Sequence, residues 1–207
     1  MDKDHLNTLI RRHGLISDQV DARELEVILS ELVRTLGMVE GAVVEFGCYR
    51  GTTSLYVRRI LDMVAPDRAF HVYDSFEGLP QKSRHDASPA GEQFVTGELS
   101  VSKKDFIIEF KKAGLKLPVV HKGWFDSLTD ADVPPQIAFA FLDGDYYESV
   151  ATSLRLIQDH LSPGATIIID DYANEALPGA ERAVREWASV RNLPIRSVAS
   201  LAVLHVI

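Results

Sequence analysis

Apolar positions along the chain follow two periods, which predict alternating strands and helices. Short unbroken apolar runs predict buried strands at 42–46, 69–73, 118–121, 137–142 and 165–169. Apolar residues spaced three to four apart predict helices at 24–36, 52–64, 148–160 and 179–191. The capping pattern Ser102-Lys-Lys-Asp105 predicts a further helix that ends near Ala113. We expect a turn at 162–164, followed by two closing strands, 195–199 and 201–207, paired as a hairpin around Ser200.

This order of elements predicts an α/β fold. Strands that are apolar throughout are typical of parallel sheets covered by helices on both faces. We therefore expect a Rossmann-like, doubly wound, mostly parallel seven-stranded sheet with a C-terminal antiparallel hairpin. The chain is expected to form one domain, 1–207, in which 1–40 is a short N-terminal helical extension. The segment 77–100 has little periodicity, and a loop of that length is usually functional or partly disordered.

Composition narrows the functional classes. The 207 residues include 30 acidic and 22 basic side chains, and this formal charge of −8 disfavours general binding of nucleic acid. No apolar run approaches the ~20 residues of a membrane span, and the charged N-terminus does not resemble a secretory signal. The single cysteine, Cys48, excludes an intrachain disulfide. We expect a soluble, cytoplasmic protein that acts on a small molecule and has no nucleic-acid or membrane partner.

Ligands bind parallel sheets at the carboxyl ends of strands, so the residues that follow each strand are the first candidates. After the first strand, Gly47 and Gly51 allow a tight turn into a helix, but their spacing is not that of a dinucleotide fingerprint. The charge of Glu45 would repel a phosphate and attract an amino group. After the second strand, Asp74 is placed to accept hydrogen bonds from ribose hydroxyls. Together these segments indicate a nucleoside ligand without phosphates, although each alone is also compatible with an ordinary turn.

Aromatic and acidic residues follow the remaining strands. Trp124 and Phe125 are placed either to sandwich a purine ring or to pack in the core. Asp143 follows the fourth strand, and Asp170 and Asp171 follow the fifth, so adjacent strands would bring three carboxylates together. Carboxylates this close repel one another unless a cation lies between them, and oxygen ligands suit Mg²⁺, with Mn²⁺ or Ca²⁺ as alternatives. The alternative for Asp170 and Asp171 is a solvated pair that caps a helix.

Five blocks of sequence are distinctive in their order and spacing. They are VEFGCYRG at 44–51, DSFEGLP at 74–80, GWF at 123–125, LDGDYYES at 142–149, and LSPG at 161–164 followed by IDDY at 169–172. These blocks resemble the macrocin O-methyltransferase family of class I S-adenosylmethionine-dependent methyltransferases. The resemblance implies the class I methyltransferase fold, S-adenosylmethionine and Mg²⁺ as cofactors, and methylation of a hydroxyl on a sugar or glycosylated natural product.

The resemblance also implies roles for individual residues. Glu45 would face the ammonium of the cofactor, Asp74 its ribose hydroxyls and Trp124 its adenine. The other implied cofactor-binding positions are Phe46, Gly47, Cys48, Tyr49, Gly51, Thr52, Thr53, Ser75, Phe76, Gly78, Ser102, Gly123, Phe125 and Asp143. The implied metal ligands are Asp143, Asp170 and Asp171. Asp143 is the first candidate for the base that deprotonates the acceptor, and Asp145 is the second, unless Asp145 caps the helix that follows it.

The N-terminal helical region is expected to be shorter than is usual in the family. This weakens the case for a macrolide acceptor and leaves 77–100 as the candidate lid. Within that segment, His85, Asp86 and Ser88 lack the Gly-x-Ser-x-Gly motif of a hydrolase and are expected to lie in a flexible loop. Cys48 is expected to be a small buried residue. The alternative function is a non-catalytic module that binds S-adenosylmethionine, and a homo-oligomer is left open.

Overall fold

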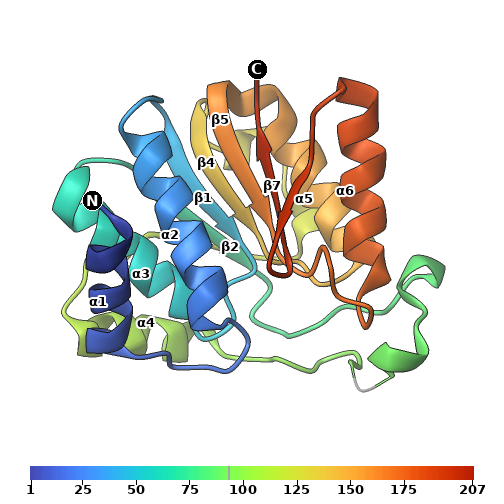
Figure 1. Ribbon diagram of the computed structural model, residues 1–207. Coiled ribbons are helices and arrows are strands. Elements are labelled where there is room, and N and C mark those ends of the chain that lie inside the picture. The colour runs from blue at the N-terminus through green and yellow to red at the C-terminus, as the bar shows by residue number, and fades with distance from the viewer. Residues whose placement is uncertain (93) are drawn as a thin grey trace.

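The strands form one seven-stranded sheet with the order β3-β2-β1-β4-β5-β7-β6. The structure is a computed structural model that describes residues 1–92 and 94–207. The strands are β1 (Ala42–Phe46), β2 (Phe70–Asp74), β3 (Val119–Lys122), β4 (Ile137–Leu142), β5 (Leu161–Ile169), β6 (Arg196–Val198) and β7 (Leu201–His205). The first five are parallel, and β7 runs antiparallel to both of its neighbours. The predicted doubly wound sheet and its C-terminal hairpin are confirmed (Figure 1).

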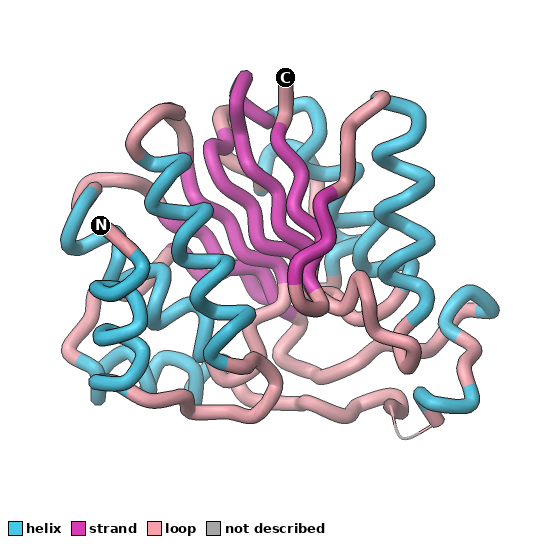
Figure 2. Tube along the Cα trace, viewed as in Figure 1, coloured by secondary structure: helices cyan, strands magenta, loops and turns pink. Residues whose placement is uncertain are grey.

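Helices cover both faces of the sheet, as Figure 2 shows. One face is covered by α1 (Lys3–His13), α2 (Ala22–Leu36), α3 (Thr52–Val64) and α4 (Lys103–Ala113), and the other by α5 (Tyr147–Ile157) and α6 (Pro178–Arg191). Residues along a strand alternate between these two cores, because successive side chains point to opposite faces. Val43 of β1 packs with the first group of helices and Val44 with the second. None of the described helices is long and apolar enough to cross a membrane.

The predicted turn at 162–164 is wrong, because these residues belong to β5. The Ser162 hydroxyl donates a hydrogen bond to the Glu40 carbonyl at 2.8 Å, and the Gly164 N–H donates to the Val206 carbonyl at 3.1 Å. Pairing with β4 is irregular at this point, and Gly164 adopts a φ of +83°. The Pro-Gly pair therefore lies at a bulge inside a long strand, where the Gly164 N–H and the neighbouring Ser162 hydroxyl both find hydrogen-bond acceptors. The helix expected at 148–160 ends at Ile157 and continues as a single 3₁₀ turn.

The N-terminal helices are part of the core. Leu6 and Ile10 of α1 are buried, and the Tyr56 hydroxyl of α3 donates to the carbonyls of Ile10 and Gly14. The helix α2 begins with a capping box in which the Asp21 carboxylate accepts from the Glu24 N–H and the Glu24 carboxylate accepts from the Asp21 N–H. The residues before the first strand thus form a wall fixed to the sheet.

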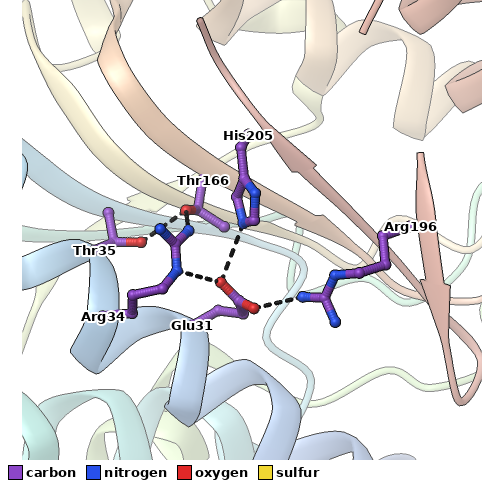
Figure 3. A network of polar contacts seen from close by, with 6 residues as sticks. All are labelled: Glu31, Arg34, Thr35, Thr166, Arg196 and His205. Carbon is purple, nitrogen blue, oxygen red and sulfur yellow. Dashed lines mark hydrogen bonds and ion pairs between the residues drawn. The ribbon is translucent and has the colours of Figure 1, made fainter. Parts of the chain in front are cut away.

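A polar network holds the C-terminal half of α2 against the last three strands of the sheet (Figure 3). Glu31 accepts hydrogen bonds from Arg34 of its own helix and from Arg196 of β6, and it lies 3.2 Å from the ring nitrogen of His205 in β7. Arg34 in turn donates to the Thr166 hydroxyl of β5 at 2.9 Å. Burial by itself would raise the pKa of Glu31, but the hydrogen bonds from Arg34 and His205 outweigh it and lower the pKa. The orientation of α2 is therefore tied to the sheet by charge as well as by packing.

Candidate active site

A cavity of about 1030 Å³ lies at the carboxyl ends of β1, β2, β4 and β5. In the sheet, β2 lies on one side of β1 and β4 lies on the other. The direction in which successive strands are added therefore reverses beside β1. Such a switch point leaves a crevice that the helices do not fill, and ligands of open α/β sheets bind there. Most of the residues predicted from the sequence as functional meet at this cavity.

The turn after β1 requires glycine at position 47. Gly47 has a φ of +84°, and a Cβ atom there would lie 1.8 Å from the carbonyl oxygen of Asp143. The Asp143 N–H donates to the Phe46 carbonyl at 2.8 Å, so the ends of β1 and β4 are in direct contact. This close approach places the backbone of the first loop beside the first acid of β4.

Asp74 organises the same loop from the end of β2. Its Oδ2 accepts hydrogen bonds from the N–H groups of Cys48 at 2.8 Å and Tyr49 at 3.2 Å, and its Oδ1 accepts from the Phe76 N–H at 2.6 Å. A carboxylate can accept about four hydrogen bonds, so Asp74 retains capacity for one more group from the cavity that it lines.

Glu45 lies behind this loop and does not line the cavity. Its side chain is 1 % exposed, and Oε2 accepts a hydrogen bond from the Ser54 hydroxyl of α3 at 2.6 Å. Burial raises the pKa of Glu45 to about 8, with a further contribution from the charge of Asp74. Cys48 is buried as predicted, and burial raises the pKa of its thiol, with the charge of Asp74 adding to the effect. A protonated thiol is a poor nucleophile, so Cys48 is unsuited to covalent chemistry.

Aromatic residues form the wall of the cavity at the carboxyl ends of β2 and β3. Trp124 and Phe125 line the cavity, and Trp124 is 37 % exposed. Phe125 packs edge-on against Phe46 at 5.3 Å, and Phe46 stacks on Tyr73 at 4.3 Å. His121 stacks on the other face of Tyr73, also at 4.3 Å, which gives this histidine a structural place in the sheet. The two alternatives for the aromatic pair therefore apply to different residues. Phe125 packs in the core and also borders the cavity, whereas Trp124 has an exposed ring face.

Four carboxylates gather at the ends of β4 and β5. Oxygen atoms of Asp143, Asp145 and Asp171 all lie within 4.8 Å of one another. Asp170 adjoins them; its Oδ1 accepts from the Asp171 N–H at 2.8 Å and lies 3.3 Å from the Ser200 hydroxyl. Burial raises the pKa of Asp143, Asp145 and Asp170, and the neighbouring carboxylates raise it further. Burial likewise raises the pKa of Asp171, to about 6.

The geometry of this acidic cluster differs from the expected set of three. Asp145 joins Asp143 and Asp171 with a φ of +58°. The alternative in which Asp145 caps the next helix is wrong, because the N-cap residue of α5 is Tyr146. The Tyr147 N–H at the start of α5 instead donates to Asp86, at 2.7 Å.

That contact belongs to the segment 77–100, which packs over the cavity. Asp86 is fully buried and also accepts from the N–H and hydroxyl of Ser83, so it is part of the packed structure, contrary to the expected flexible loop. The Ser88 hydroxyl donates to the Glu175 carbonyl at 2.7 Å, and the His85 ring packs on Tyr147. Leu79 packs with Tyr146 and Leu177 in a small separate core. Gln93 of this segment lies outside the described residues.

Sequence reasoning missed the wall opposite this segment. Asp18, Gln19, Asp21 and Glu24, from the connection between α1 and α2 and the first turn of α2, line the cavity together with Ser200 at the tip of the C-terminal hairpin. The Ser200 hydroxyl donates to Glu24. The Asp-x-x-Glu pattern at 21–24 signals a helix start, but it carries no indication that this start faces a ligand.

Several predicted cofactor positions do not line the cavity. They are Glu45, Phe46, Gly51, Thr52, Thr53, Phe76, Ser102 and Gly123. Ser102 is exposed and caps α4, where its hydroxyl donates to Asp105 and accepts from the Asp105 N–H. Thr52 is buried, and its hydroxyl lies 2.8 Å from that of Ser17. The predicted residues that do line the cavity are Gly47, Cys48, Tyr49, Asp74, Ser75, Gly78, Trp124, Phe125, Asp143, Asp145, Asp170 and Asp171.

Comparison with known proteins places this arrangement in a family. The family model described as Macrocin-O-methyltransferase (TylF) matches residues 18–205. A tetracenomycin-derivative 4'-O-methyltransferase of Streptomyces olivaceus is 34% identical over an alignment of 144 residues that covers 67% of this chain and 55% of that protein. Mycinamicin III 3''-O-methyltransferase of Micromonospora griseorubida is 31% identical over 72% of this chain and 61% of that protein. The chain thus spans little more than half the length of these curated relatives. Among solved structures, the O-methyltransferase NovP superimposes with a TM-score of 0.78 at 25% identity, covering 89% of this chain and 79% of that one.

Proposed function

The chain belongs to the macrocin O-methyltransferase family, and on that premise we propose that it transfers the methyl group of S-adenosylmethionine to a hydroxyl of a glycosylated small molecule, with Mg²⁺ as the metal cofactor. One observation carries the proposal. The carboxylates at the ends of β4 and β5 open into the same cavity as Asp74 and Trp124. The residues that we propose for the methyl donor and the carboxylates that we propose for the cation therefore line one cavity.

The residues of the cavity fit the cofactor. Asp74 has capacity left for a ribose hydroxyl, and Trp124 offers an exposed ring face for adenine. The Gly47–Tyr49 backbone, held by Asp74, leaves room for the methionine moiety beside Cys48. The volume of about 1030 Å³ lies at the upper end of ligand pockets, which suits a cofactor together with an acceptor.

The acidic cluster fits a divalent cation. Three carboxylate oxygens within 4.8 Å of one another, in buried surroundings that disfavour their charge, gain most from a hard cation between them. Asp143, Asp145 and Asp171 would hold the ion, with Asp170 beside them. When bound, a divalent cation supplies Lewis acidity that lowers the pKa of an adjacent alcohol.

The protein's own contribution is positioning and proton removal. Methyl transfer needs the acceptor oxygen in line with the carbon–sulfur bond, and walls that include Leu79 and Phe94 would restrict both reactants to that approach. We assign proton removal to Asp143, because its backbone touches the Gly47 loop on the cofactor side and its carboxylate lies in the acidic cluster. Asp145 is the second candidate.

The experiment is a transfer assay with S-adenosylmethionine labelled in its methyl group and a panel of glycosides. Asp143→Asn should abolish transfer, while its circular dichroism and its binding of S-adenosylhomocysteine remain. Transfer at the full rate in excess EDTA would refute the metal requirement. Calorimetric binding of S-adenosylhomocysteine without transfer to any acceptor would instead favour a non-catalytic binding module.

A further inference from the structure

Two short 3₁₀ turns of the chain share one capping motif. In each turn a hydroxyl residue binds an aspartate three positions later, Ser83 with Asp86 and Thr129 with Asp132. The Oδ2 atom of Asp86 accepts from the Ser83 N–H at 2.9 Å and from the Ser83 hydroxyl at 2.7 Å. The Oδ2 atom of Asp132 accepts from the Thr129 N–H at 2.9 Å and from the Thr129 hydroxyl at 2.8 Å. The motif therefore occupies only one oxygen of each carboxylate.

The second carboxylate oxygen distinguishes Asp86 from Asp132. The Oδ1 atom of Asp86 accepts from the Tyr147 N–H at the start of α5 at 2.7 Å, and the side chain is fully buried. Asp132 remains partly exposed, and within the described part of the chain its carboxylate has no further hydrogen-bond partner. Burial of a carboxylate costs free energy, and capping a 3₁₀ turn does not require it. The burial of Asp86 therefore serves the contact with α5.

The start of α6 is shaped to let Asp86 reach α5. A Cβ atom on Gly179, in the first turn of α6, would lie 1.9 Å from the Asp86 Oδ1 atom and 2.7 Å from the Tyr147 nitrogen. Gly179 belongs to a helix, so its own backbone conformation does not require glycine. The close approach of three segments accounts for it, and the residues 83–91, green in Figure 1, lie beside the first turn of α6.

The same residues 83–91 also hold the connection between β5 and α6. The Ser88 hydroxyl donates to the Glu175 carbonyl at 2.7 Å. The neighbour of Glu175 in the chain, Asn174, donates from its side-chain amide to the Asp171 carboxylate at 2.7 Å. One short segment therefore contacts both the first turn of α5 and the connection that orients Asp171.

These two contacts lie on the two turns that carry the acidic cluster. Tyr147 follows Asp145 by two residues, and Asp171 opens the connection that Ser88 holds. Asp145 and Asp171 adopt positive φ angles of +58° and +57°, so the direction of each side chain depends on an irregular turn. Carboxylate oxygens of the cluster lie within 4.8 Å of one another, and a change in the spacing of the turns would change that arrangement.

We propose that Asp86 is a positioning residue for the cation. By joining the segment 83–91 to α5, it fixes the Asp145 turn relative to the Asp171 turn and thereby sets the affinity of the acidic cluster for a divalent cation. Asp86 does not line the cavity, so it acts without touching the cation or the substrate. The inference rests on the proposed metal-dependent methyl transfer and deepens it. Groups that orient metal ligands from outside the ligand set typically account for about 10–100-fold in metal affinity.

The experiment measures Mg²⁺ binding by calorimetry, with S-adenosylhomocysteine bound, for Asp86→Ala and Asp86→Asn. Ala removes both oxygens, whereas Asn keeps an oxygen for the Tyr147 N–H and an amide that can donate to the Ser83 hydroxyl. We expect the Kd for Mg²⁺ to rise about tenfold in Asp86→Ala and to stay within about threefold of the wild type in Asp86→Asn. The Kd for S-adenosylhomocysteine without metal should stay unchanged in both, because general destabilisation would weaken both ligands.

Asp132→Ala is the matched control, because it removes the same capping motif outside the acidic cluster and should leave Mg²⁺ binding unchanged. If Asp86→Ala does not fold by circular dichroism, Gly179→Ala takes its place, since the added Cβ atom would push α5 and Asp86 away from α6. It should weaken Mg²⁺ binding in the same way. Its control is Gly37→Ala, where the nearest atom to the added Cβ lies at 3.7 Å.

The outcomes separate this inference from the proposed function. Wild-type affinity for Mg²⁺ in the folded variant, or an equal loss in its control, would overturn the role of Asp86 and leave the proposed function standing. If the wild type itself binds no Mg²⁺ with S-adenosylhomocysteine present, the metal requirement of the proposed function fails, and the role of Asp86 fails with it.

Discussion

Replacing Glu45 with Gln should stabilise the cofactor-free protein, and the gain should grow as the pH rises. Glu45 is 1 % exposed, and burial raises its pKa from 4.5 to about 8. The folded protein therefore retains a proton that the unfolded chain releases between pH 4.5 and 8, so the stability of the wild type falls as the pH rises through that range. Gln resembles the protonated side chain in shape and can still accept from Ser54, but it has no proton to lose.

The magnitude follows from the two pKa values. Between pH 5 and pH 8 the burial of Glu45 costs the wild type an additional amount on the order of 3 kcal/mol, at 1.36 kcal/mol for each pKa unit. The other buried acids respond to pH in both proteins, so their effect largely cancels when the variant is compared with the wild type; Asp143 is the exception, because the charge of Glu45 contributes to its raised pKa. The difference in unfolding free energy between the two proteins should therefore be small at pH 5 and reach its full size at pH 8.

Urea unfolding at pH 5, 6, 7 and 8, followed by circular dichroism, measures this difference. The matched control is Glu40→Gln, where the side chain is 91% exposed and pairs with Arg68 at the surface, so its difference from the wild type should not widen with pH. Parallel profiles of stability against pH for Glu45→Gln and the wild type would refute the reasoning.

Three further predictions concern the loop, the helix α2 and the acidic cluster. Gly47→Ala would place a Cβ atom 1.8 Å from the Asp143 carbonyl oxygen at a φ of +84°, and we expect a loss of more than about 3 kcal/mol by thermal unfolding; an unchanged Tm would contradict this. Glu31→Gln should cost about 1–2 kcal/mol at pH 7 through the weakened contacts with Arg34, His205 and Arg196. Because the pKa of Glu31 is lowered from its ordinary value of 4.5, the cost should be fully present above that pH and be lost as the pH falls through the lowered pKa; a cost independent of pH in urea unfolding would argue against the network. Asp171→Asn should raise the Tm in EDTA, because it relieves repulsion among the clustered carboxylates. It should also remove the further rise in Tm that Mg²⁺ gives the wild type, and an equal response of both proteins to Mg²⁺ would place the cation elsewhere.

Local patterns were sufficient for most of the fold. The strand bounds at 42–46 and 137–142 and the helix at 52–64 agree with the structure, because apolar period and flanking glycines are properties of neighbouring residues. The prediction of a turn at 162–164 was wrong because residues distant in the sequence decide the structure there. A Pro-Gly pair is a turn signal on its own, but contacts with Glu40 and Val206, far away in the sequence, hold it inside a strand.

The candidate site divides in the same way. Asp74, Asp143 and Asp171 were predictable, since residues that follow parallel strands must meet at one edge of the sheet. The sequence left two alternatives for Asp145, a base in the site or a cap of the next helix. Only the backbone at this turn, with its positive φ, brings the side chain into the acidic cluster. Glu45 was expected in the cavity. In the structure it belongs to the layer behind, because the alternation along β1 points it at Ser54 of α3.

The sequence by itself determined most of the strands and helices, the acids at the strand ends and the resemblance to a methyltransferase family. These follow from local period and from motifs whose residues are close together in the chain. Only the tertiary structure decided that Glu24 and Ser200, which lie 176 residues apart, share one wall, and that Asp86 reaches across 61 residues to the first turn of α5. Such contacts depend on how helices and loops pack over the sheet, and no local pattern encodes which way a loop side chain will face.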